Sequence, residues 1–132
     1  MRSAMHTTIS LGDTDAAGVL FYARLFELTQ RAFEHHCAGC GFPIARFFTD
    51  RILAPVVHVE ADYRRALRLG DAITVEATVE SIGDSSFRMG YVVRTEDGAL
   101  AAEALVVHVC IGADGRSAPV PALLRAALAP HG

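Results

Sequence analysis

The chain has 132 residues, a formal net charge of −3 and an apolar fraction of 52%. This length fits one domain with one modest core, so we predict a single domain over residues 1–132. The apolar content excludes a mainly disordered chain, and 12 basic against 15 acidic residues exclude a field that would gather nucleic acid. All 12 basic residues are arginine, which excludes Schiff-base and phosphate-loop chemistry that depends on lysine.

The sequence contains no pattern typical of export or membrane insertion. Its first ten residues lack the apolar core of a signal peptide, and the most apolar run, residues 99–111, is interrupted by Glu103 and His108. Three cysteines do not indicate a disulfide framework. We therefore expect a cytoplasmic protein that has neither a membrane nor a nucleic-acid partner.

The first half of the chain predicts one strand, one turn-rich stretch and one long helix. Residues 5–11 are compatible with a strand, and Gly12–Gly18 is rich in turn-forming residues. From Tyr22 to His36, apolar and aromatic residues recur at spacings of three and four, which is typical of a helix with one buried face. The glycines within Cys37–Gly41 are expected to end that helix.

The second half predicts an antiparallel sheet. Apolar and polar residues alternate in three segments, so each segment should bury one face. These segments start at Val57, Ile73 and Phe87. A fourth strand is expected over Leu100–Ile111 and a short helix over Ala122–Ala129, whereas residues 44–55 show no clear pattern. The sequence therefore predicts an α+β fold in which a five-stranded antiparallel sheet buries the apolar face of one long helix.

The stretch Gly12–Gly18 combines two carboxylates, Asp13 and Asp15, with small residues just before the predicted helix. A helix start presents unpaired N–H groups that can stabilise a carbonyl oxygen as it gains negative charge. A nearby carboxylate could attack that carbonyl or activate a water. The alternative is that both carboxylates only stabilise the turn and cap the helix.

The chain resembles the 4-hydroxybenzoyl-CoA thioesterase family of hotdog-fold proteins through the run Gly12-Asp13-Thr14-Asp15-Ala16-Ala17-Gly18-Val19-Leu20-Phe21-Tyr22 and the aromatic-rich helix after it. The segment Asp-Thr-Asp-Ala-Ala-Gly is most similar to the branch that hydrolyses 1,4-dihydroxy-2-naphthoyl-CoA. The predicted order of elements is similar to that of a hotdog over most of the chain. The resemblance therefore implies a hotdog fold and an acyl-CoA thioesterase activity on an aromatic or short-chain acyl group.

The resemblance also implies roles for individual residues. Asp15 falls on the catalytic carboxylate, which acts as nucleophile or general base, and the backbone N–H of Tyr22 falls on the group that polarises the thioester carbonyl. Asp13 is expected to anchor the turn. The expected substrate-binding residues are Gly18, Phe21, Val57 and Arg116.

Arginine is the expected partner of the CoA phosphates. Some family members carry a basic cluster in the turn between the third and fourth strands, but here that turn reads Gly83-Asp84-Ser85-Ser86. Arg116 matches another basic position and is preferred. The cluster Arg64, Arg65 and Arg68 is expected to form ion pairs on a solvated face.

Neither a metal nor another cofactor is expected. Cys37-Ala38-Gly39-Cys40 could mark a metal or redox site, but its place at a helix end favours two small structural cysteines. His58 and His108 are interpreted as structural histidines.

Because the hotdog substrate groove lies between subunits, we expect a homodimer as the minimal active unit and a homotetramer as the assembly. Two other functions stay open. One is a hotdog that binds acyl-CoA or an acyl carrier protein without turnover, and the other is an enoyl-thioester hydratase or dehydratase.

Overall fold

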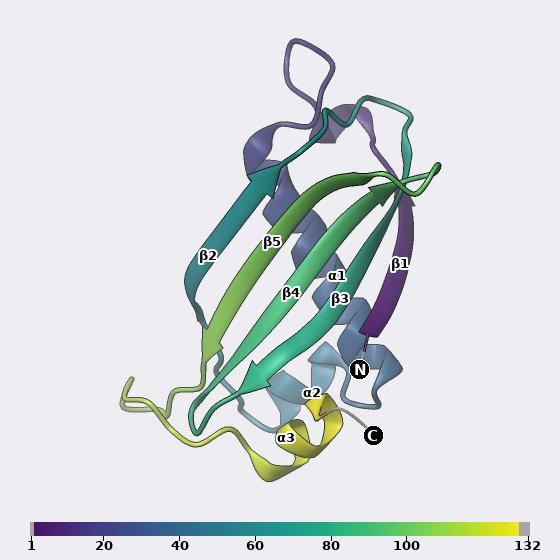
Figure 1. The fold of residues 1–132 in the computed structure, drawn as a ribbon. Coiled ribbons are helices and arrows are strands. Elements are labelled where there is room, and N and C mark those ends of the chain that lie inside the picture. Colours follow the sequence, from purple (N-terminus) through teal and green to yellow (C-terminus); the bar gives the residue numbers. More distant parts are fainter. Residues whose placement is uncertain (1, 130–132) are drawn as a thin grey trace.

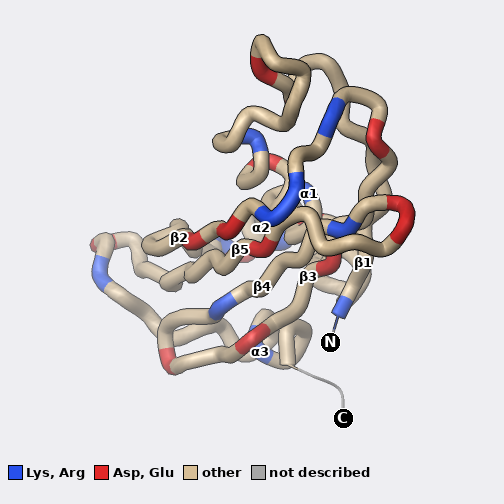
Figure 2. The backbone as a smooth tube through the Cα atoms, turned by 45° about the horizontal axis from the view of Figure 1, so that its top comes forward, with Lys and Arg blue, Asp and Glu red and all other residues tan. Residues whose placement is uncertain are grey.

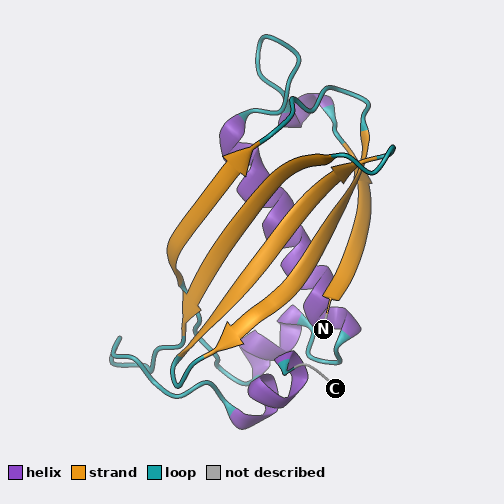
Figure 3. Cartoon of the chain, in the orientation of Figure 1, coloured by secondary structure: helices purple, strands orange, loops and turns teal. Residues whose placement is uncertain are grey.

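The computed structural model describes residues 2–129 and contains one antiparallel five-stranded sheet with the strand order β1-β3-β4-β5-β2. Its long helix α1 lies against one face of the sheet, and the short helices α2 and α3 lie near one end (Figure 1; Figure 3). The strands are β1 (Arg2–Thr8), β2 (Val56–Tyr63), β3 (Ala72–Ile82), β4 (Ser86–Thr95) and β5 (Leu100–Val109). The helices are α1 (Leu25–Gly39), α2 (Ile44–Thr49) and α3 (Ala122–Leu128).

The core forms between α1 and the inner face of the sheet. The predicted helical stripe is buried on α1, and the predicted inner faces of β3 and β4 are buried opposite it. These buried residues include Leu25, Leu28, Ala32 and Phe33 on the helix and Val75, Ala77, Met89 and Tyr91 on the strands. The predicted hotdog fold, a sheet wrapped around one helix, is confirmed.

Several boundaries differ from the prediction. The first strand covers Arg2–Thr8 instead of residues 5–11, and β5 ends at Val109 instead of Ile111. A short 3-10 turn over Tyr22–Arg24 precedes α1, so the regular helix begins three residues later than Tyr22. The unassigned residues 44–55 contain α2, whose Phe47 packs against Phe33 and Phe42.

The prediction of a buried face on β2 is wrong for the single chain. Val57 and Val59 keep 58% and 45% of their surface exposed, and Ala61 is the one half-buried residue of the strand. The reason is position, because β2 is an edge strand that pairs only with β5. Period-two patterning sorts residues onto faces but does not say whether another layer covers a face.

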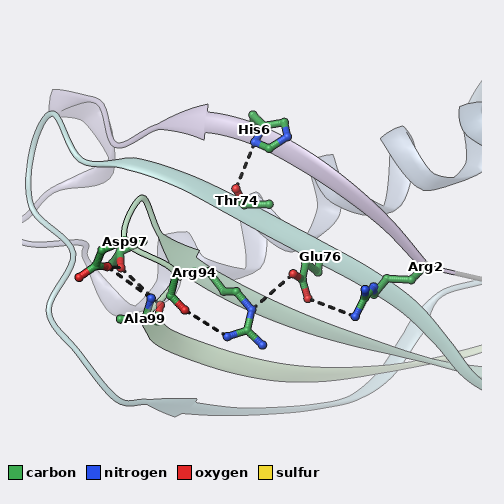
Figure 4. A network of polar contacts seen from close by, with 9 residues as sticks. Arg2, His6, Thr74, Glu76, Arg94, Asp97 and Ala99 are labelled. Carbon is green, nitrogen blue, oxygen red and sulfur yellow. Dashed lines mark hydrogen bonds and ion pairs between the residues drawn. The ribbon is translucent and has the colours of Figure 1, made fainter.

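The outer face of the sheet is polar and internally paired. Glu76 on β3 accepts ion pairs from Arg2 on β1 at 3.9 Å and from Arg94 on β4 at 3.4 Å (Figure 4). Short acidic and basic segments are scattered along the backbone, separated by longer uncharged stretches (Figure 2). On the single chain, these ion pairs link three strands across the outer face of the sheet.

The helices of residues 2–129 include none with the length and apolarity that a bilayer crossing requires.

Candidate active site

The stretch between β1 and α1 folds back on itself as a small hairpin over residues 13–21. Phe21 N–H donates to Asp13 O at 2.8 Å, and Thr14 pairs with Leu20. The hairpin is attached to the β2–β3 connection, because Leu20 N–H donates to Leu67 O at 2.7 Å. The motif therefore does not run directly into the helix, as the sequence suggested, but forms a loop fixed at its base.

Asp15 forms the tight turn at the end of this hairpin. Its Oδ1 accepts from Ala17 N–H at 2.8 Å and from Val19 N–H at a longer 3.4 Å. Its Oδ2 has no hydrogen-bond partner within the described residues 2–129, and the residue is exposed. One carboxylate oxygen thus holds the turn while the other faces solvent.

Gly18 makes this turn possible. Its N–H donates to Asp15 O at 3.0 Å, and its φ of +79° lies in the left-handed region that side chains other than glycine rarely adopt. The motif needs glycine at this position for a conformational reason, apart from any contact with substrate.

Asp13 has the structural role that was expected of it. Its Oδ2 accepts from both the N–H and the hydroxyl of Ser10, each at 2.9 Å. This capping arrangement closes the turn before the hairpin and leaves Asp15 as the carboxylate with a free oxygen.

Tyr22 begins the 3-10 turn that leads into α1. Its N–H has no acceptor within residues 2–129, because a first helical residue has none in its own helix. Its carbonyl accepts a hydrogen bond from the hydroxyl of Tyr63, the last residue of β2. The Phe21 and Tyr22 rings lie tilted at 50° to each other with centroids 4.7 Å apart, and both rings are exposed. The helix start is thus an accessible donor fixed to the sheet.

Two expected substrate-binding residues lie far from this hairpin in the same chain. Val57 is at the opposite end of β2 from Tyr63, about 20 Å away at the usual rise per strand residue. Arg116 follows β5 at that same opposite end, in a loop joined to residue 53 by way of Ile111. One protomer therefore brings together Asp15, Gly18, Phe21 and Tyr22, but not Val57 or Arg116.

The arginines beside the hairpin are mostly paired with carboxylates. Arg64 lies 3.3 Å from Glu103, and Arg65 lies 3.6 Å from Asp97. The side chains of both arginines border a hollow of about 320 Å³ next to the base of the hairpin.

Ion pairing with Glu60 and Asp62 is the predicted role of this arginine cluster, and Arg64 does lie 3.9 Å from Asp62. Glu60 pairs with His58 instead, and Arg68 has no ion pair within residues 2–129.

The comparisons with known proteins match almost the whole chain. The thioesterase-like superfamily matches residues 9–128. The chain belongs to this superfamily. It is 34% identical over 120 residues to a 1,4-dihydroxy-2-naphthoyl-CoA hydrolase of Synechococcus elongatus, and the match covers 89% of this chain and 88% of that protein.

Solved structures of thioesterases share the fold of this superfamily member. A 1,4-dihydroxy-2-naphthoyl-CoA thioesterase from Synechocystis matches with a TM-score of 0.90 and 24% identity, covering 97% of this chain and 96% of the other. A gentisyl-coenzyme A thioesterase matches with a TM-score of 0.85 and 24% identity, covering 93% and 99%. These likenesses confirm the hotdog architecture.

In this chain, the Cys-x-x-Cys segment lies at the C-terminal end of α1. Cys37 is buried and Cys40 half-buried, and burial raises the pKa of the Cys37 thiol to about 12. Burial also raises the pKa of Cys40. Both thiols are therefore protonated at neutral pH, which suits packing rather than thiolate chemistry.

Sequence reasoning missed one contact of this site, and it did not reveal the surroundings of His108 at the other end of the molecule. Tyr63 lies 41 residues from Tyr22, and no local pattern links the two. His108 was interpreted as structural, and one of its ring nitrogens does bond to a backbone carbonyl. The feature that draws attention to the other ring nitrogen is a pocket lined by His108, and that pocket exists only in the folded chain.

Proposed function

We propose that the protein hydrolyses an acyl-CoA thioester to a free acid and CoA, with Asp15 as nucleophile or general base and the Tyr22 N–H as carbonyl donor. The observation that carries this proposal is that one hairpin has a free carboxylate oxygen at its tip and is followed directly by a free helix-start N–H. Both groups are exposed, so a thioester can reach them from solvent.

The chemistry follows from these two groups. The Tyr22 N–H stabilises the carbonyl oxygen as negative charge develops there. Asp15 either attacks the carbonyl carbon, forming an anhydride that water then opens, or takes a proton from a water that attacks it. In both routes the C–S bond breaks, the CoA thiolate takes a proton, and the acyl group leaves as a carboxylate. Neither route needs a metal.

We propose that two copies pair through β2. The strand leaves one edge unpaired and exposes valines along it, and such an edge favours the addition of another strand. Antiparallel pairing around a two-fold axis places the Val56 end of one β2 beside the Tyr63 end of the other. Val57 and Arg116 would then lie near the partner's hairpin rather than their own.

Arg116 has no ion pair within the described residues, so it is available to a CoA phosphate. Assembly into a tetramer and a cytoplasmic location stay predictions.

The relatives favour an aromatic acyl group over a short aliphatic one. The proteins matched above are named for 1,4-dihydroxy-2-naphthoyl and gentisyl thioesters. For this chain, Phe21 at the hairpin offers an exposed aromatic surface to such a group.

The test is release of thiol from a panel of aromatic and aliphatic acyl-CoAs. Asp15→Asn keeps an oxygen that can accept from Ala17 N–H, so it should fold, and we expect a loss of at least about 100-fold in kcat. Asp13→Asn is the matched control, because its amide oxygen can still accept from Ser10; it should stay within a few-fold of the unaltered protein.

Other outcomes distinguish the open alternatives. Binding of acyl-CoA without thiol release would favour a binding protein. Hydration of an enoyl-CoA without thiol release would favour a hydratase. Full activity of Asp15→Asn would exclude the proposed mechanism.

A further inference from the structure

An apolar pocket of about 300 Å³ lies between α1, α2 and the start of β2, at the end of the molecule away from the Asp15 hairpin. Its aromatic walls come from Phe33, Phe47 and Phe48. Of the side chains that line it, only Gln30 and His108 carry polar atoms. The pocket therefore suits a flat apolar group that presents one or two polar atoms.

His108 supplies a fixed hydrogen-bond acceptor in this pocket. Its Nδ1 lies 2.8 Å from Ala54 O, and because a carbonyl only accepts, Nδ1 carries the proton. The ring is 5% exposed and stacks on Phe33 and Phe87, with centroids 5.0 Å and 4.7 Å away. Burial also lowers its pKa, which keeps the imidazole neutral at neutral pH. Nε2 is therefore an unprotonated acceptor.

Nε2 of His108 is not fully buried. Within residues 2–129, His36 Nε2 is the one fully buried side-chain nitrogen or oxygen without a hydrogen-bond partner. His108 Nε2 has no partner in that part of the chain either, so it retains some accessible surface. That surface belongs to a residue that lines the pocket.

The pocket is too far from the hairpin of its own chain to take the same acyl group. Phe33 follows Tyr22 by eleven residues, which is about 16 Å of helix and longer than an acyl group of one or two rings. Val56, however, lines the pocket, and Tyr63 bonds to Tyr22. Pairing of β2 with its copy brings these two ends together, so the pocket of one protomer faces the hairpin of its partner.

We propose, resting on the function above, that this pocket receives the acyl group of a thioester held at the partner's hairpin, and that His108 Nε2 selects an aromatic ring bearing a hydroxyl. The hydroxyl donates to Nε2 while the ring packs against the phenylalanines. An unsubstituted ring leaves Nε2 without a donor in a closed site, which costs transition-state stabilisation.

The first experiment measures kcat/KM for benzoyl-CoA and its 2-, 3- and 4-hydroxy and fluoro derivatives. Fluorine is close to hydroxyl in size but cannot donate. We expect at least one hydroxy isomer to exceed its fluoro counterpart by about tenfold or more. This comparison needs no variant, so folding cannot confound it.

Two variants then assign the preference to His108. His108→Phe keeps the stacked ring, and His108→Asn keeps a donor for Ala54 O; both lose the Nε2 acceptor. Each variant should bring the ratio of kcat/KM between hydroxybenzoyl-CoA and fluorobenzoyl-CoA to about one, while benzoyl-CoA is still cleaved. His6→Phe, on the exposed opposite edge strand, is the matched control and should keep the ratio.

Subunit mixing tests whether the pocket acts on the partner. Asp15→Asn and His108→Phe protomers are unfolded and refolded together. In a mixed dimer, the intact Asp15 then faces the intact His108 of the other chain, so the hydroxyl preference should return. A ratio that stays at about one after mixing would overturn the arrangement across subunits.

The outcomes separate the two proposals. Cleavage of benzoyl-CoAs with no hydroxyl preference, or a preference unchanged in His108→Phe, overturns the role of His108 and leaves the thioesterase proposal intact. Absence of thiol release from every acyl-CoA tested overturns the thioesterase proposal, and the role of His108 with it.

Discussion

The hydroxyl of Tyr63 donates a hydrogen bond to the carbonyl of Tyr22, which joins the last residue of β2 to the first turn before α1. The N–H of Tyr22 is the proposed carbonyl donor, so this bond controls where that donor points. We expect Tyr63→Phe to lower kcat about three- to tenfold with little change in KM, because a displaced donor weakens transition-state binding more than substrate binding.

Steady-state kinetics with a cleaved acyl-CoA checks this expectation, and a thermal melt shows whether the fold is retained. A rise in KM at constant kcat would mean that Tyr63 contacts substrate instead of positioning the helix start.

Gly18→Ala should reduce both stability and activity. Its φ of +79° costs an alanine on the order of 1 kcal/mol, and the strain falls on the turn that holds Asp15. Gly41→Ala is the matched control, because its φ is +82°, its Cβ would meet open space, and it lies beyond the far end of α1. Urea unfolding should show similar losses for the two variants, whereas kcat/KM should fall only for Gly18→Ala. Equal activity losses would show that the turn has no special role.

Ser10 and Asp13 should behave as one stabilising unit. Asp13→Ala removes both bonds that Asp13 Oδ2 accepts, whereas Ser10→Ala removes only the bond from the hydroxyl, because its backbone N–H remains. We therefore expect a loss of about 0.5–2 kcal/mol from Asp13→Ala, a smaller loss from Ser10→Ala, and little more than the Asp13→Ala loss from both together. A double-mutant cycle in urea measures this coupling. Additive losses would contradict the described capping arrangement.

The edge of β2 should control assembly. Val59→Lys places a charge on the proposed β2 interface, so we expect the variant to sediment at the 14.1 kDa mass of one chain and to lose activity. Thr8→Lys adds the same charge to the opposite edge strand and should leave assembly and kcat/KM unchanged. Full activity of a monomeric Val59→Lys would show that one chain is sufficient.

Stability should fall in mild acid. Burial lowers the pKa of His36 and of His108 below the ordinary value of about 6.5. The unfolded chain therefore binds more protons than the folded one once the pH drops below about 6.5. The contribution of these two neutral histidines to the free energy of unfolding is complete above that pH. It is lost as the pH falls toward the lowered pKa values. Urea unfolding between pH 7.5 and 5 measures the loss, which should become smaller in His108→Phe. A free energy of unfolding that stays constant or rises as the pH falls would contradict this expectation.

The elements that sequence predicted well are those whose pattern is local. The stripe on α1 and the alternation on β3 and β4 specify which side chains share a face, and both faces meet in the core. Asp15 and Tyr22 could be proposed as site residues because the eleven adjacent positions from Gly12 to Tyr22 carry the motif.

What sequence could not predict depends on distant parts of the chain. The bond from Tyr63 to Tyr22 spans 41 residues. The exposure of β2 follows from its place at the sheet edge, and the opposite ends occupied by Asp15 and Val57 follow from strand direction. His108 looked structural because its pocket is assembled from α1, α2 and the chain before β2.

The six-residue helix α2 supplies Phe47 and Phe48 to the pocket but no residue to the Asp15 hairpin. In the arrangement proposed here, mutations in α2 would change which acids are released without altering Asp15 or Tyr22. Substrate range and hydrolytic chemistry would then be encoded in separate segments of the chain, and each could change without the other.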